Sequence, residues 1–121
     1  MLIRARLTYQ PGASTPAGRL ELSDDALIWR ALPVLDASRD EHAAVWGIVT
    51  AGTFATAHAI LLAVLGEPPD ALLVTLYAED LARKSRDAGW TIDAEDVRAF
   101  AVAVEERRAH LDRESRARSQ A

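Results

Sequence analysis

The sequence predicts a mainly α-helical fold: a four-helix bundle-like domain with a long buried second helix, at about 39–65, and a short N-terminal β-hairpin, at about 2–22. The first supporting observation is a run of 25 residues without a formal charge, which extends from His42 to Gly66. The second is that apolar residues with helical spacing recur on both sides of this run. The third is the alternation of apolar and polar residues at 2–9 and again at 19–22.

The N-terminal segment has the pattern of two short strands. Residues 2–9 place apolar side chains on one face and polar ones on the other, which is typical of a half-buried strand. The stretch 11–18 contains two prolines and two glycines and predicts a loop, and alternation returns at 19–22. An isolated hairpin is marginally stable in water, so we expect it to pack on helices or on another chain.

Polar capping residues predict where the first helix begins and ends. Ser23 supplies an N-cap side chain, and Asp24 and Asp25 would lie at the positive end of the helix dipole. An apolar stripe follows until Pro33, which ends or kinks a helix because it lacks a backbone N–H. The sequence therefore predicts a first helix over about 23–32.

The second helix is expected to be the central element of the bundle. Ser38 and Glu41 have the spacing of a capping box, and Gly66 suits a left-handed C-cap. A helix that is apolar all round must be buried on every side. Small residues recur along it every fourth position and predict a helix-packing or dimer interface; they are Ala43, Gly47, Ala51, Ala55, Ala59 and Ala63.

The same run is long enough to be weighed as a membrane span. Polar residues near its middle, Thr50, Thr53, Thr56 and His58, are costly in lipid. Its flanks are mostly acidic and lack the cationic and aromatic anchors of membrane helices. A buried soluble helix is therefore favoured, and contact with a membrane is not expected.

Two further helices complete the predicted bundle. The third begins at Pro69 or Asp70 and closes at Gly89, with apolar residues early and basic residues late. The fourth begins near Asp93 and carries one apolar face, formed by Val97, Phe100, Ala101, Val104 and Leu111. We expect one domain over 1–121, made of the hairpin at 2–22, the helical bundle at 23–112 and a frayed tail at 113–121.

Composition excludes several functional classes. A net charge of −4 argues against binding nucleic acid by overall electrostatics. The absence of cysteine removes thiol catalysis and thiolate metal sites. The first ten residues lack the apolar core of a signal peptide, so we expect a cytoplasmic protein. Thirteen arginines against one lysine, Lys84, suggest a GC-rich bacterial genome.

Few residues suggest chemistry. Trp46, Thr50, Phe54 and His58 fall on one row of the predicted second helix and form a possible ligand pocket. A neutral core histidine is the favoured interpretation of His58, because no carboxylate lies near it in sequence. The potential metal ligands Asp36, Asp40, Glu41 and His42 are better explained as cap and loop residues. No catalytic residue, metal or cofactor is expected.

The sequence thus favours a small non-enzymatic protein–protein interaction module that associates with itself as a homodimer, or with another protein. The alternative is a helical bundle that binds a small apolar ligand, or is weakly catalytic, around Trp46, Phe54 and His58. A weaker hypothesis is a DNA-associated helical dimer that uses the arginine-rich tail.

Overall fold

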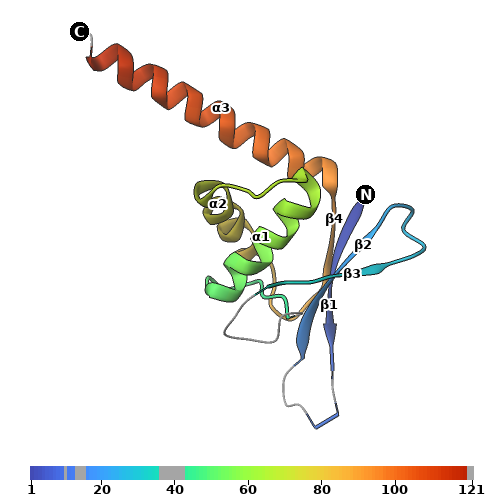
Figure 1. The fold of residues 1–121 in the computed structure, drawn as a ribbon. Coiled ribbons are helices and arrows are strands. Elements are labelled where there is room, and N and C mark those ends of the chain that lie inside the picture. Colours follow the sequence, from blue (N-terminus) through green and yellow to red (C-terminus); the bar gives the residue numbers. More distant parts are fainter. Residues whose placement is uncertain (10, 13–15, 36–42, 120–121) are drawn as a thin grey trace.

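The described residues form a mixed α/β domain in which three helices accompany a four-stranded antiparallel sheet (Figure 1). The computed structural model describes residues 1–9, 11–12, 16–35 and 43–119. The strand order is β3-β2-β1-β4. The strands are β1 (Leu2–Thr8), β2 (Ala17–Ser23), β3 (Arg30–Leu32) and β4 (Trp90–Asp93). The helices are α1 (Ala51–Leu65), α2 (Ala71–Ala82) and α3 (Ala94–Ser119).

The predicted four-helix bundle is therefore wrong. The hairpin of β1 and β2 is present, but β3 and β4 extend it on both edges. β4 follows α2 in sequence and pairs with β1, with Ile92 opposite Ile3. Four strands with one apolar face can be stable where a lone hairpin is marginal, because the added pairing and burial offset the chain entropy.

The predicted first helix, at 23–32, is a turn followed by β3. The Ser23 hydroxyl accepts a hydrogen bond from the N–H of Ala26 at 2.9 Å. The Asp25 carboxylate accepts bonds from the N–H groups of Ile28 and Leu27, which lower the pKa of this carboxyl group. Side chains that cap helices make the same bonds in isolated turns. Ala26 has a positive φ of 64°, a conformation that a right-handed helix cannot contain.

The predicted long helix at 39–65 is also wrong, because α1 begins only at Ala51. The Ser38–Glu41 capping box and the Asp36, Asp40, Glu41 and His42 cluster lie outside the described residues. The true cap is Thr50, whose side chain and that of Thr53 bond reciprocally to backbone N–H groups. Gly66 ends α1 in the left-handed conformation, as the sequence predicts.

Residues 44–50, which we call the strap, cross between the sheet and the helices in an irregular conformation. The N–H of Ala44 bonds to the carbonyl of Gly18 on β2, and that of Gly47 bonds to the carbonyl of Leu81 on α2. The N–H of Val45 donates to the Thr56 hydroxyl of α1 at 2.9 Å. The strap thus connects β2, α1 and α2 through backbone groups that a helix would have used internally.

The core lies between the helices and one face of the sheet. Alternate residues of β1 and β2 point toward it, and Ile3, Ala5, Leu20 and Leu22 are buried there. The buried face of α1 includes Ala57, Ile60 and Leu61. Of the predicted small row, only Ala51, Ala55, Ala59 and Ala63 belong to α1, since Ala43 and Gly47 precede it.

Helix α3 is the longest element and extends well beyond the rest of the protein (Figure 1). Its first two turns are packed, with Ala94, Val97 and Ala101 buried. Its second half is exposed along most of its surface, and the helix continues through Ser119 where the sequence predicts fraying from Arg113.

Candidate functional site

A largely apolar groove lies between α2 and the middle of α3. We call it the helix groove; its lining includes Leu72, Leu76, Phe100, Val104, Arg107 and Leu111. Its volume is about 440 Å³. Leu72 and Leu111 are 46% and 49% exposed and line the same groove. The groove is therefore a candidate contact surface for another protein.

Packing of α3 on α2 holds the helix groove open. The ring of Phe100 meets Tyr77 edge-on, with ring centroids 5.1 Å apart. Burial, assisted by the charges of Asp80 and Asp96, raises the pKa of Tyr77 well above its ordinary range. Tyr77 is buried in the core, whereas Phe100 is half-buried and lines the groove.

An ion pair connects the middle of α3 to the start of α2. Arg108 donates two hydrogen bonds to the carboxylate of Asp70, at 3.1 and 3.2 Å. Asp70 is also the N-cap of α2, where it accepts a bond from the N–H of Leu73. The guanidinium of Arg108 and this N–H together lower the pKa of Asp70. The contact thus joins α3 to α2 through the residue that caps α2.

Charge is distributed asymmetrically along α3. Residues 94–106 contain four carboxylates and one arginine, a net charge of −3, whereas residues 107–119 contain five arginines and two carboxylates, a net charge of +3. The apolar residues Val97, Phe100, Val104 and Leu111 follow the a and d spacing of a coiled coil, with Arg107 at the intervening d position. The apolar face is predicted from the sequence, whereas the charge asymmetry of the same helix is not, although these residues carry it.

The predicted pocket residues separate into two places. Phe54 and His58 line a second groove of about 410 Å³, the α1 groove, together with Leu35, Ala55, Leu62 and Val74. His58 is exposed there, so the expectation of a buried core histidine is wrong. Trp46 and Thr50 both belong to the strap, and Thr50, at its end, caps α1.

Trp46 is a buried residue that joins the strap to the segment between α2 and β4. It is 4% exposed, and its indole N–H donates to the carbonyls of Ser85 and Ala88 at 2.8 and 3.1 Å. Its ring meets Trp90 edge-on, with centroids 5.7 Å apart. Within the described residues, the Trp90 indole N–H is the buried side-chain polar group that has no hydrogen-bond partner.

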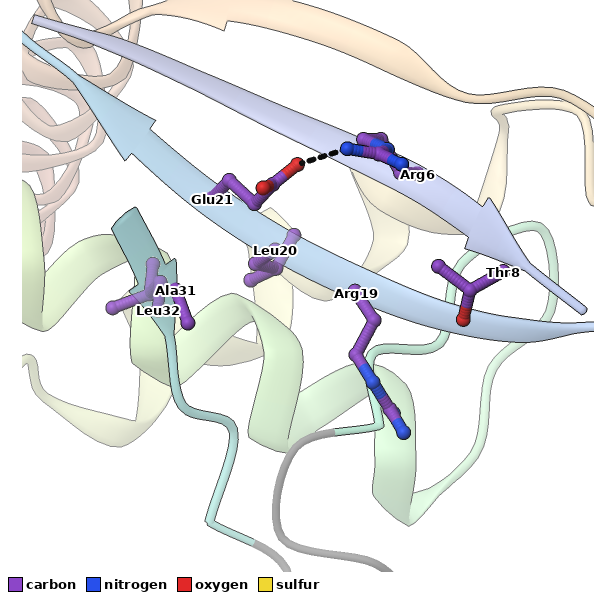
Figure 2. Close-up of a pocket in the computed structure, with 7 residues that line it drawn as sticks. All are labelled: Arg6, Thr8, Arg19, Leu20, Glu21, Ala31 and Leu32. Carbon is purple, nitrogen blue, oxygen red and sulfur yellow. Dashed lines mark hydrogen bonds and ion pairs between the residues drawn. The ribbon is translucent and has the colours of Figure 1, made fainter. Parts of the chain in front are cut away.

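A third concavity, the sheet hollow, lies where β3 ends beside β2. Figure 2 shows its lining, in which Leu20 lies between the end of β3, at Ala31 and Leu32, and the side chain of Arg19. Arg6, Thr8 and Glu21 complete the lining, and its volume is about 360 Å³. The alternation at 2–9 predicts only that Arg6 lies on the polar face of a strand, and no role is predicted for it from the sequence.

Comparison with known proteins does not narrow these possibilities. The chain matches no protein-family model, and no curated protein or solved structure shows significant similarity to it. In the described part of the chain, no helix combines the length and apolar character needed to cross a bilayer.

Proposed function

We propose that this protein is a protein–protein interaction module that associates with a second copy of itself through the helix groove and α3. The observation that carries the proposal is the opposite charge of the two halves of α3, beside an exposed apolar groove. A cytoplasmic location remains the expectation from the sequence.

An antiparallel arrangement of two α3 helices satisfies both features at once. It places the acidic half of each helix against the basic half of the other, and this complementarity favours antiparallel over parallel pairing. With a two-fold axis between residues 105 and 106, Leu111 of each copy lies opposite Phe100 of the other. In this register, a positions face d positions, as in an antiparallel coiled coil. The contact is self-complementary, as a two-fold dimer requires.

We expect Leu111→Glu to convert a dimer into a monomer, because a carboxylate would have to be buried beside Phe100 of the second copy. Light scattering should give a mass of about twice 13.2 kDa for the unmodified protein and 13.2 kDa for the variant. Val102→Glu is the matched control, since Val102 is on the same helix, 56% exposed, and outside the lining of the helix groove. A monomeric parent protein at tens of micromolar would contradict the proposal.

The orientation can be measured separately. The chain has no cysteine, so Ser115→Cys provides a unique position for a spin label. Antiparallel helices centred at 105–106 place the two labels roughly 30 Å apart along the axis, whereas parallel helices place them roughly 10 Å apart. A short distance would reject the antiparallel register and leave dimerisation itself intact.

The α1 groove supports a second candidate function, binding of a small apolar ligand beside Phe54 and His58. Its volume lies within the range of small-molecule sites, and its lining is predominantly apolar. Ala55→Leu would fill the groove, so we expect it to abolish the fluorescence increase of an apolar naphthalene dye. Ala51→Leu, on the exposed first turn of α1, is the control. Equal dye binding by both variants would exclude the α1 groove as the site.

A further inference from the structure

An apolar groove lies between the first half of α3 and the turn that joins α1 to α2 (Figure 1). We call it the turn groove; its volume is about 680 Å³, within the range of small-molecule sites. Leu73 and Ala101 line it from the core and are 6% and 9% exposed, whereas Val102 is 56% exposed. The other apolar residues of its lining are Leu65, Pro68 and Pro69. The turn groove therefore offers apolar surface to a ligand.

Charge at the turn groove is not balanced. Its lining contains four carboxylates and one guanidinium group, those of Glu67, Asp70, Glu105, Glu106 and Arg98. Two residues outside the lining form ion pairs with it. Arg108 pairs with Asp70 and Glu105, and Glu95 pairs with Arg98. When both outside partners are included, five carboxylates stand against two guanidinium groups, a net charge of −3. The excess of negative charge therefore remains after the ion pairs are counted.

Two of these carboxylates, Glu67 and Glu106, have no ion-pair partner among the described residues. Glu67 belongs to the turn and Glu106 to α3, so they come from the two walls of the turn groove. Both side chains are exposed. The groove thus combines two unpaired negative charges, one on each wall, with an apolar lining.

We propose that the turn groove binds an elongated organic dication, in which two ammonium groups are joined by an apolar chain. The chain lies against Leu73, Ala101 and Val102, and the ammonium groups pair with Glu67 and Glu106. Each part of this ligand has a counterpart in the lining. A monoamine would leave one of the two carboxylates unpaired. A compact divalent metal ion prefers to be surrounded by oxygen ligands, and it would leave the apolar lining uncovered.

This site is separate from the proposed dimer contact. The turn groove and the helix groove both include residues of α3, but they share no lining residue. The inference therefore goes beyond the proposed function, and its test does not depend on dimerisation.

Octane-1,8-diamine is the probe that tests the turn groove. We expect titration of ¹⁵N-labelled protein at pH 7 and constant ionic strength to shift the amide signals of residues 65–67 and 98–106 in a saturable way. Octylamine has the same chain but one ammonium group, so it should bind about two- to fivefold more weakly, as expected for the loss of one exposed ion pair. Octane-1,8-diol, which has no charge, should bind more weakly than either amine.

Substitutions on the two walls test the assignment of the carboxylates. Glu67→Gln and Glu106→Gln should each weaken diamine binding by about two- to fivefold. The double variant should bind the diamine and octylamine equally, because neither second charge has a partner. Glu79→Gln is the matched control: it removes the same charge from an exposed position on α2 that does not line the groove, so the diamine preference should persist.

A change in the apolar wall tests the other half of the proposal. Val102→Ser should weaken binding of both amines to the same extent, since it reduces the surface that their chains cover. Glu67, Val102 and Glu106 are all exposed, so we expect the variants to fold. Unsaturable shifts, equal binding of the diol, a diamine preference that survives in the double variant, or an equal loss in Glu79→Gln would each overturn the proposal. Displacement of the diamine by Mg²⁺ at the same ionic strength would also overturn it.

Discussion

Trp46→Ala is expected to lower the free energy of unfolding by about 3–5 kcal/mol. The substitution removes a buried ring that packs edge-on against Trp90. It also leaves the carbonyls of Ser85 and Ala88 without the indole N–H that bonds to both of them. Because these carbonyls precede β4, losing their partner should loosen the approach of that strand to the sheet. Urea denaturation followed by circular dichroism measures the effect.

Two further variants separate the contribution of the Trp46 ring from that of its indole N–H. Trp46→Phe retains a ring but not the N–H, so an intermediate cost of about 1–3 kcal/mol is expected from the unpaired carbonyls. Trp29→Ala is the control, because Trp29 is only half-buried and its stacking with Arg4 should be worth about 1 kcal/mol. If Trp46→Ala and Trp29→Ala cost the same, the strap is not anchored through this ring.

Gly47→Ala should produce the second large loss of stability, about 2–5 kcal/mol in total. Gly47 has a φ of +80°, which an alanine adopts only at a cost. An added Cβ would also lie 2.9 Å from the backbone nitrogen of Arg86 and 2.9 Å from the carbonyl oxygen of Lys84. Both are main-chain atoms, so relief of this clash requires the segment after α2 to move. Thermal or urea unfolding provides the comparison.

Gly66→Ala provides a matched control for backbone strain. Gly66 has nearly the same φ, +77°, but an added Cβ there would meet no atom within 4 Å. We expect only the conformational cost of about 1–2 kcal/mol. The difference between the two variants therefore measures the close approach of the strap to residues 84–86. Equal costs would show that backbone conformation alone determines the effect at Gly47.

Local signals predicted those elements whose ends are set by short-range hydrogen bonds. Alternation located β1, Asp70 marked the start of α2, and Gly66 marked the end of α1. The failures occurred where a tertiary contact replaced a local one. Val45 and Gly47 donate their N–H groups to α1 and α2, so an apolar, uncharged segment forms a strap and not a helix. Hydropathy alone does not reveal which partner such groups choose.

The candidate sites were predictable to different degrees. Periodicity identified the apolar face of α3, because spacing within one helix is a local property. The sheet hollow depends on the register that places Arg6 opposite Arg19, and this register was not assigned from the sequence. The prediction that His58 is buried is wrong, because burial of a residue on α1 depends on which face of the helix packs against the rest of the fold. A helix that was assumed to be enclosed on all sides has an exposed edge.

The pairing of β1 with β4 also has a consequence for synthesis on the ribosome. β1 is translated well before its partner strand β4. Ile92, which lies opposite Ile3, is translated only after the residues of α1 and α2. At elongation rates of about 5–20 residues per second this interval is on the order of ten seconds. During it, β1 and β2 can form a hairpin, while the other edge of β1 remains an open template for pairing with neighbouring nascent chains. Slow codons before residue 90 should therefore increase aggregation during expression, whereas slow codons within α3 should not.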